Sequence, residues 1–158
     1  MLQETAQITL TSPEQTAAFA VRLGTCLTAG DTVLLEGSIG AGKTHFARSL
    51  IQSRLTAPED VPSPTFTLVQ TYEADGVEIW HSDLYRLTSP DEVIELGLID
   101  AFDTAICLVE WPDRLGNLTP RDALTLRFTQ GDSEDKRVIS LTWEDAKWSS
   151  RLNGVLDD

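Results

Sequence analysis

Short apolar runs and alternating segments recur along the chain and predict strands. Continuous apolar runs at 32–36 and 105–109 are typical of strands buried on both faces of a parallel sheet. Alternation of apolar and polar positions predicts further strands at 6–10, 66–72, 77–82, 123–129 and 137–142. Asp75-Gly76 is a strong hairpin-turn signal, and 123–129 with 137–142 suggest a second antiparallel pair.

Helix signals fill most of the intervals between these strands. Ser12 can cap a helix, Pro13 suits the first helical position, and Gln15 completes a capping box. We expect this helix to run to about Ala29 and to end at Gly30. A second helix is predicted from Lys43 to about Arg54. A third begins at a second capping box at 89–92 and ends at Gly97. A last helix is expected over about 144–153, with Trp148 and Leu152 packed against the core.

The order of these elements predicts a three-layer α/β domain with a mixed parallel and antiparallel sheet. A length of 158 residues favours a single domain over 1–158, and no internal repeat or linker divides it. The two cysteines, Cys26 and Cys107, lie in apolar patterns and are expected to be buried, reduced thiols. No cysteine–histidine pattern suggests zinc.

The net charge of −13, from 25 acidic and 12 basic residues, restricts the possible partners. Such a surface repels phosphate backbones, so nucleic acid is not expected to bind directly over a broad face. A basic protein partner and a purely solubilising role remain equal alternatives. No apolar run reaches the roughly 20 residues of a membrane span, and no secretory signal is evident, so a cytoplasmic protein is expected.

The chemistry concentrates in the loop after the strand at 32–36. Gly37, Gly42, Lys43 and Thr44 match the pattern G-x-x-x-x-G-K-[ST] in full. The glycines let backbone N–H groups cradle phosphates at the start of the next helix, where the helix dipole favours an anion. Lys43 is expected to reach the β- and γ-phosphates, and the Thr44 hydroxyl to bind Mg²⁺. The cofactor-binding loop residues are Ile39, Gly40, Ala41, Gly42, Lys43, Thr44 and, through its N–H, His45.

This context predicts a P-loop NTPase-like domain. A glycine-rich turn that binds nothing is disfavoured, because Lys43 near a core would then lack an anionic partner. No N-K-x-D motif is present, which disfavours a GTPase. A phosphate loop alone does not name the reaction.

Two acidic residues are candidates to act beside Lys43 in catalysis. Glu110 ends a buried strand, where it can ligate Mg²⁺ or merely cap the strand end. Asp83 is the second candidate. Alternatively, it is a solvent-exposed acidic residue in a turn and has no catalytic role. Neither histidine has metal-ligand spacing, and His81 is expected to be packed or solvated rather than catalytic.

Several stretches between residue 12 and about residue 115 together resemble the TsaE (YjeE) family of bacterial P-loop ATPases. The phosphate loop is common to many proteins, but SPTF, DLYRL and EWP in this order are highly specific. The matching stretches are SPEQT (12–16), GAGKT (40–44), VPSPTFTLVQTY (61–72), HSDLYRL (81–87), ELGL (95–98) and LVEWPDRL (108–115).

The resemblance implies an ATPase of tRNA threonylcarbamoyladenosine biosynthesis that uses ATP/ADP and Mg²⁺. It implies binding to a TsaB–TsaD pair, in which TsaD modifies adenosine 37 of tRNA. The TsaE-like member would hydrolyse ATP slowly to reset that pair, would not be the transferase, and would meet tRNA only through the complex.

The resemblance also implies roles for particular residues. Thr44 and Glu110 would ligate Mg²⁺, Lys43 would hold the phosphates, and Asp83 would lie close to the metal or the attacking water. The switch-like or partner-facing residues would be Ser63, Pro64, Thr65, Phe66, Tyr85 and Trp111. The prolines could instead only shape the start of a strand, and the two aromatic residues could be plain core.

Adenine contacts are harder to derive. Ser12 and Thr16 lie in a stretch that resembles the family and could approach the base or ribose. Arg137 could flank the base or be a surface arginine. The chain departs from the family at Ser38, where aspartate is usual, and at His45, where threonine or serine is usual. Backbone binding should survive both changes, but a role of that aspartate in hydrolysis or partner contact is in doubt.

Two other functions share the same phosphate loop. A small-molecule kinase would need a cluster of arginines in a lid, whereas the arginines here are scattered. A nucleotide sensor that assembles a complex without hydrolysis would need no catalytic carboxylate. Assays of phosphate transfer and of a Glu110→Gln variant separate these alternatives.

Overall fold

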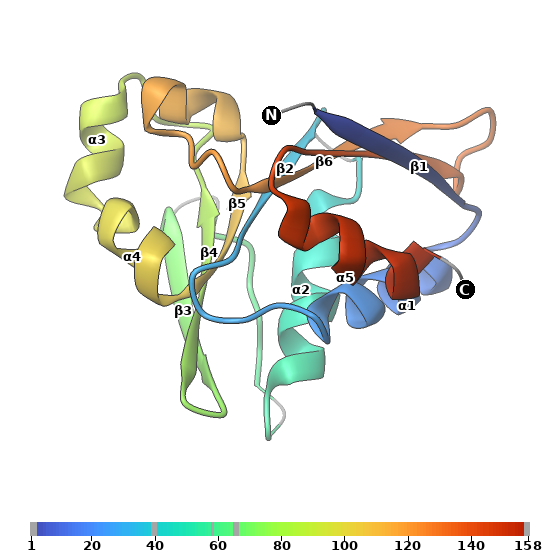
Figure 1. The fold of residues 1–158 in the computed structure, drawn as a ribbon, viewed down its shortest axis with the longest axis horizontal. Helices are drawn as coiled ribbons and strands as arrows, with labels where there is room; N and C mark the ends of the chain where they lie inside the picture. Colours follow the sequence, from blue (N-terminus) through green and yellow to red (C-terminus); the bar gives the residue numbers. More distant parts are fainter. Residues whose placement is uncertain (1–2, 39–40, 58, 65–66, 157–158) are drawn as a thin grey trace.

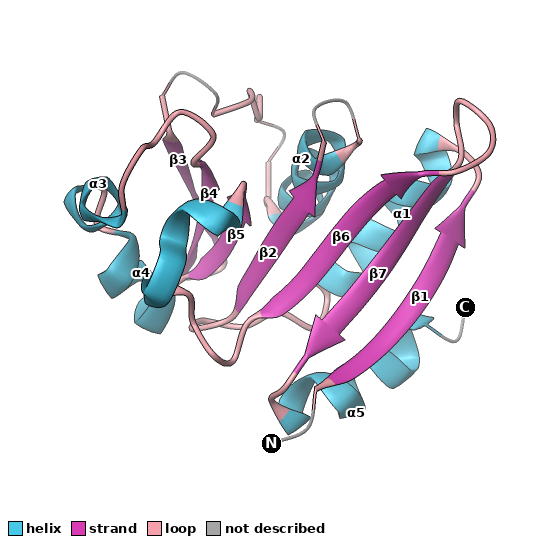
Figure 2. Cartoon of the chain, turned by 90° about the horizontal axis from the view of Figure 1, so that it is seen from above, coloured by secondary structure: helices cyan, strands magenta, loops and turns pink. Residues whose placement is uncertain are grey.

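A computed structural model describes residues 3–38, 41–57, 59–64 and 67–156. Its described strands form one mixed seven-stranded sheet in the order β1-β7-β6-β2-β5-β4-β3 (Figure 2). The strands are β1 (Glu4–Leu10), β2 (Thr32–Gly37), β3 (Val69–Ala74), β4 (Val77–Asp83), β5 (Ile106–Glu110), β6 (Leu124–Gln130) and β7 (Arg137–Trp143). The pairs β4–β5, β5–β2 and β2–β6 are parallel, while β3, β7 and β1 pair with their neighbours in antiparallel fashion.

Helices cover both faces of this sheet (Figures 1 and 2). One face carries α1 (Pro13–Gly24), α2 (Lys43–Arg54) and α5 (Ala146–Leu156). The other carries α3 (Pro90–Glu95), α4 (Leu98–Thr104) and the 3₁₀ segment η1 (Pro112–Leu118). The predicted three-layer α/β fold with a mixed sheet is therefore confirmed.

Two apolar cores lie on the two faces of the sheet, and they explain the continuous apolar runs. In β2, Val33 and Leu35 belong to the core under α1, α2 and α5. Leu34, between them, belongs to the core under α3 and α4. Because both faces of β2 and β5 are covered, neither strand needs a polar face.

Helix α1 ends earlier than the sequence predicts. It stops at Gly24 rather than near Ala29. The Arg54 guanidinium of α2 donates to the carbonyl oxygens of Gly24 at 2.6 Å and of Leu27 at 2.9 Å, which satisfies carbonyls that a longer helix would bond internally. Gly30 does take a left-handed conformation, with φ of 93°, but in the turn before β2.

Other local predictions agree with the structure in most details. Asp75 and Gly76 both have positive φ, as the predicted hairpin turn requires. The first strand of that hairpin begins at Val69 rather than 66. Gly97 ends α3 as predicted, but the short helix α4 that follows was not predicted. Ser12 accepts a hydrogen bond from the Gln15 N–H at 3.1 Å and caps α1.

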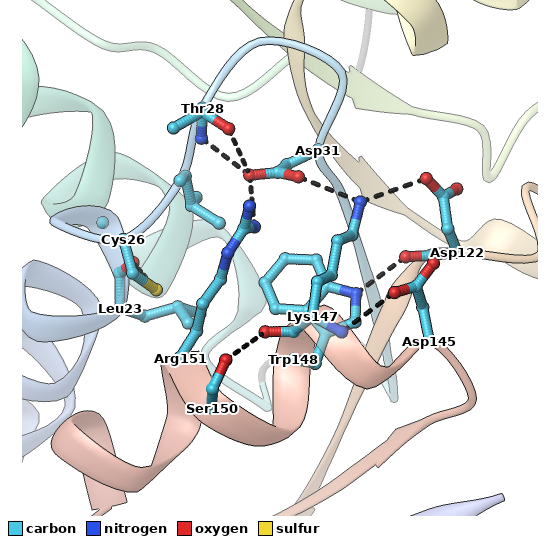
Figure 3. Close-up of polar contacts among 12 residues, drawn as sticks. Leu23, Cys26, Thr28, Asp31, Asp122, Asp145, Lys147, Trp148, Ser150 and Arg151 are labelled. Carbon is cyan, nitrogen blue, oxygen red and sulfur yellow. Dashed lines mark hydrogen bonds and ion pairs between the residues drawn. The ribbon is translucent and has the colours of Figure 1, made fainter.

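The C-terminal helix α5 begins and ends a few residues later than the predicted 144–153, and it packs its predicted face inward. Trp148 and Leu152 are both buried. Lys147 and Arg151, which lie beside the Trp148 ring, point toward Asp31, the residue that immediately precedes β2 (Figure 3). Residues far apart in sequence thereby join α5 to the start of the central strand.

The two thiols are free, as expected. Cys107 is buried in β5, and burial raises its pKa to about 12. Cys26 is only half-buried, and burial is also the largest cause of its raised pKa. Within the described residues, no helix has the length and apolar character needed to cross a membrane.

Candidate functional site

The loop between β2 and α2 lies at the carboxyl end of the parallel strands. Gly37 has φ of 142°, and a Cβ there would lie 2.7 Å from the Phe128 carbonyl oxygen, so only glycine fits. Gly42, with φ of 102°, precedes the first turn of α2. Of the predicted loop residues, Ile39 and Gly40 lie outside the described residues.

The Lys43 ammonium group lies inside this loop. The residue is 4 % exposed, and its Nζ donates to the Gly37 carbonyl oxygen at 2.6 Å. The same nitrogen lies 3.7 Å from the centroid of the Trp111 ring. Burial lowers the pKa of Lys43, while the nearby carboxylates of Glu110 and Asp83 partly oppose that shift. A partly desolvated cation of this kind favours an anionic partner.

Two predicted acids meet beside this lysine because β4 and β5 are parallel neighbours in register. Asp83 pairs with Glu110 across the two strands. Glu110 is 2 % exposed, and its two carboxylate oxygens accept from the Thr44 hydroxyl at 2.9 and 3.0 Å. Asp83 is buried rather than solvated, and its Oδ1 accepts from the Tyr85 N–H at 3.0 Å.

A further residue, His81, joins this group although sequence reasoning assigned it no role. It is fully buried, and its Nε2 lies 2.7 Å from Glu110 Oε2. The signal was present in the strand pattern, because residues two apart in a strand share one face. His81 therefore faces the same side of β4 as Asp83.

Two aromatic rings lie at the rim of the site. Trp111 has a left-handed backbone, with φ of 59°, directly after Glu110. Its ring contacts that of Tyr85, with 4.7 Å between the centroids. Tyr85 is 43 % exposed, so it is not a core residue.

The switch-like segment is only partly described, since Thr65 and Phe66 lie outside the described residues. The Pro64 carbonyl oxygen accepts from the Leu68 N–H at 2.7 Å. The Leu68 carbonyl oxygen in turn accepts from the Asp83 N–H at 2.9 Å. The segment that follows Ser63 is thus tied by backbone bonds to the acidic end of β4.

The residues predicted to contact adenine differ in their surroundings. Ser12 caps α1, and the Thr16 hydroxyl donates to the Ser12 carbonyl oxygen at 3.4 Å. His45, at the start of α2, has its Nε2 3.0 Å from the Pro13 carbonyl oxygen, so its side chain joins α2 to the beginning of α1. The sequence predicted a role only for the backbone N–H of His45.

Arg137 lies against the phosphate loop. Its Nε donates to the Ala41 carbonyl oxygen at 3.0 Å. The guanidinium also donates to the carbonyl oxygens of Glu134 and Lys136 at 2.6 and 3.1 Å. Arg137 therefore supports the loop backbone from β7.

The side chains around Lys43 determine which kind of metal ion could bind there. In the described parts of the chain, no group of three or more histidine, cysteine or acidic side chains could hold a metal ion. The Thr44 hydroxyl and the Glu110 carboxylate are adjacent oxygen groups, 2.9 Å apart. Magnesium commonly takes one or two protein ligands together with substrate phosphates, so these residues fit a magnesium ion that arrives with a nucleotide.

Comparison with known proteins agrees with this geometry. The family model for the threonylcarbamoyl adenosine biosynthesis protein TsaE matches residues 10–139. The tRNA threonylcarbamoyladenosine biosynthesis protein TsaE of Rickettsia bellii is 38% identical over 139 residues, which cover 88% of this chain and 96% of that protein. The protein of the same name from Bacillus subtilis is 34% identical over 132 residues, which cover 83% of this chain and 81% of that protein.

A solved structure supports the fold. The crystal structure of Bacillus subtilis YdiB superposes with a TM-score of 0.79 at 24% identity, covering 99% of this chain and 97% of that chain. The match of the family model extends from the end of β1 into β7 and includes the phosphate loop and both acidic strands. The chain therefore belongs to the TsaE family of threonylcarbamoyl adenosine biosynthesis proteins.

Proposed function

We propose that this protein binds Mg–ATP at the phosphate loop and hydrolyses it slowly in support of tRNA threonylcarbamoyladenosine biosynthesis. The observation that carries the proposal is the buried Lys43 ammonium beside the Thr44–Glu110 pair. A cation and two oxygen ligands at a helix N-terminus match the needs of a nucleotide triphosphate with its metal.

Each residue has a distinct task in this proposal. Lys43 would bind oxygens of the β- and γ-phosphates, and the loop N–H groups would surround them. Thr44 and Glu110 would hold the magnesium ion, which neutralises charge that develops on the transferred phosphoryl group. Asp83, next to Glu110 in register, would bind the attacking water or a water on the metal. The carbonyl contact from Arg137 would keep the loop in shape.

A low intrinsic rate follows from the arginines around the site. Arg137 donates to the loop backbone, and Arg114 donates to the Tyr85 carbonyl oxygen at 3.2 Å and to Asp113 at 2.8 Å. Neither is poised to neutralise a γ-phosphate without leaving these partners. Slow P-loop hydrolases gain several orders of magnitude in rate when a partner supplies a missing group.

We further propose that the partner is the TsaB–TsaD pair and that tRNA is met only through it. The net charge of −13 supports docking on proteins rather than on a phosphate backbone. The partly exposed pair Tyr85–Trp111 beside the nucleotide site is suited to sense such a partner. The protein would not perform the transfer to adenosine 37 itself.

The test measures ATP hydrolysis with and without TsaB–TsaD, alongside formation of threonylcarbamoyladenosine in tRNA. We expect slow hydrolysis by the protein alone, faster hydrolysis in the complex, and a large decrease of both activities in Glu110→Gln. Fast turnover independent of the partners would contradict the proposal. Phosphate transfer to a nucleoside or metabolite would indicate a kinase, and full tRNA modification by Glu110→Gln without hydrolysis would indicate a sensor.

A further inference from the structure

His81 is a buried polar side chain in a position that packing alone does not explain. It lies in β4, between β5 and the edge strand β3, on the face of β4 that also carries Ile79 and Asp83. Ile79 belongs to the apolar core of that face. An apolar residue at position 81 could continue the core without the cost of burying an imidazole.

The hydrogen bond to Glu110 determines which imidazole nitrogen carries a proton. Both side-chain oxygens of Glu110 lie within hydrogen-bond distance of the Thr44 hydroxyl. Because a carboxylate only accepts hydrogen bonds, we assign His81 Nε2, 2.7 Å from Glu110 Oε2, as the donor. Among the described residues Nδ1 has no hydrogen-bond partner, so Glu110 is the polar contact that this histidine makes there.

The hydrogen bond from His81 restricts the orientation of the Glu110 carboxylate. A glutamate side chain has three rotatable torsions, and its carboxylate can turn away from a metal unless something holds it. His81 holds it from β4, while the Thr44 hydroxyl meets it from α2. Hydrogen bonds that fix ligating carboxylates in this way typically change metal affinity or activity by about 10–100-fold.

We propose that His81 is a positioning residue, whose Nε2–H holds the Glu110 carboxylate toward Thr44 so that it can bind the magnesium ion of a nucleotide. The inference rests on the proposed function, because it concerns the same site. His81 touches neither nucleotide nor metal in this proposal and acts only through Glu110.

Two amide substitutions test this geometry. The amide nitrogen of glutamine can reach the place of Nε2, whereas that of asparagine reaches only about as far as Nδ1. The experiment compares wild type, His81→Gln and His81→Asn by titrating a fluorescent ATP analogue at graded magnesium concentrations and in EDTA. Thermal unfolding of each variant verifies that it is folded.

We expect His81→Asn to need about 10–100-fold more magnesium for half-maximal tightening of nucleotide binding. His81→Gln should remain within a few-fold of wild type. In EDTA all three proteins should bind the nucleotide equally, because Lys43 and the loop amides are unchanged. Rescue by glutamine would not occur if the histidine served only to fill space.

Two results would overturn the proposal. The first is an unchanged magnesium requirement in a folded His81→Asn protein. The second is an equal loss of binding with and without magnesium, which would indicate general damage to the core. If His81→Asn does not fold, His81→Leu replaces it as the variant without a donor, and the same two results apply. Failure of wild type to bind the nucleotide at all would instead refute the proposed function.

Discussion

Two clusters of charged side chains lie at opposite ends of β2, one buried around Lys43 and one partly exposed around the buried Asp31, and they differ in how their lysines are paired. The phosphate-loop cluster follows the strand and comprises Lys43, Thr44, His81, Asp83 and Glu110. The Asp31 cluster precedes the strand and comprises Thr28, Asp31, Asp122, Lys147 and Arg151 (Figure 3). Each contains one of the three lysines of the chain.

The Asp31 cluster is complete without any ligand. Asp31 Oδ2 accepts from the Thr28 N–H at 2.7 Å and from Arg151 at 2.7 Å, and Oδ1 lies 3.1 Å from the Lys147 ammonium. Partial burial lowers the pKa of Lys147, but hydrogen bonds to Asp122 and Asp31 outweigh this effect and raise it above its ordinary value. A cluster in which each charge faces an opposite charge serves to fix the structure.

The phosphate-loop cluster is arranged in the opposite way. The pKa of Lys43 is lowered because burial outweighs its carboxylate neighbours, and its ammonium bonds a neutral carbonyl oxygen. Anionic oxygens of a phosphate would favour the charged form of that lysine. The comparison supports the proposal that Lys43 serves a ligand, because its pKa is lowered, whereas Lys147 has its pKa raised by the acidic side chains beside it.

The largest difference between the clusters should appear in ATP affinity when the lysine of each cluster is replaced by alanine in separate variants. Lys43→Ala should weaken ATP binding by about a thousandfold, or about 4 kcal/mol, because a charge-assisted phosphate contact is lost. The matched control, Lys147→Ala, should bind ATP as wild type does but unfold at a lower temperature. Calorimetric titration measures the affinity. Unchanged affinity in Lys43→Ala would remove the basis for the comparison.

Removal of the carboxylate charge from the other cluster should mainly affect stability. Asp31→Asn leaves two cations facing an amide, and we expect the free energy of unfolding to fall by about 3 kcal/mol. This lies at the low end for a broken buried pair, because both cationic side chains are 25 % exposed. Urea unfolding measures the loss. A large loss of ATP affinity in the folded variant would show that the two clusters are not independent.

A substitution at Glu110 should affect the rate of ATP hydrolysis more than nucleotide binding. Glu110→Gln should lower the rate of ATP hydrolysis by about 100-fold, since in the proposed function this carboxylate would hold the magnesium ion. Nucleotide affinity in EDTA should stay at the wild-type value. Asp122→Asn, a charge removal in the Asp31 cluster, serves as the control and should hydrolyse ATP normally. Equal hydrolysis rates in the two variants would contradict the assigned role of Glu110.

The smallest effect should appear at alkaline pH. Because the pKa of Lys147 is raised above 10.5 in the folded protein, its ion pairs stabilise the fold fully below that pH. This contribution is lost as the pH rises through the raised pKa. Wild type should therefore be more stable than Lys147→Met at neutral pH, by less than the effect of Asp31→Asn, and the difference should shrink above about pH 10.5. A difference that is constant up to pH 12 would contradict this assignment.

Local signals predicted the part of the site that is contiguous in sequence. The bounds of α2, Lys43–Arg54, match the prediction because a left-handed glycine and a helix dipole act over a few residues. The rule that parallel strands end at one edge of a sheet placed Glu110 near the phosphate loop, and the structure shows it beside Thr44. The hairpin turn at Asp75-Gly76 was predictable because it depends only on the positive φ angles that these two residues can adopt.

Contacts between distant segments explain where prediction failed. The end of α1 depends on Arg54, a residue of another helix, so no pattern within α1 could reveal it. The bond between His81 and Glu110 joins two strands whose pairing emerges only when the sheet forms. The same holds for Asp31, whose cationic partners come from the last helix of the chain.

The sequence by itself determined the layered α/β fold, the phosphate loop and the family, because these depend on hydrophobic period, glycine conformation and short ordered motifs. Only the tertiary structure decided which buried charges are paired. Burial and pairing are set by side chains that approach through space from separate elements, and a linear pattern does not contain those distances. The contrast between Lys43 and Lys147, which are the same residue type in different surroundings, is therefore a property of the fold.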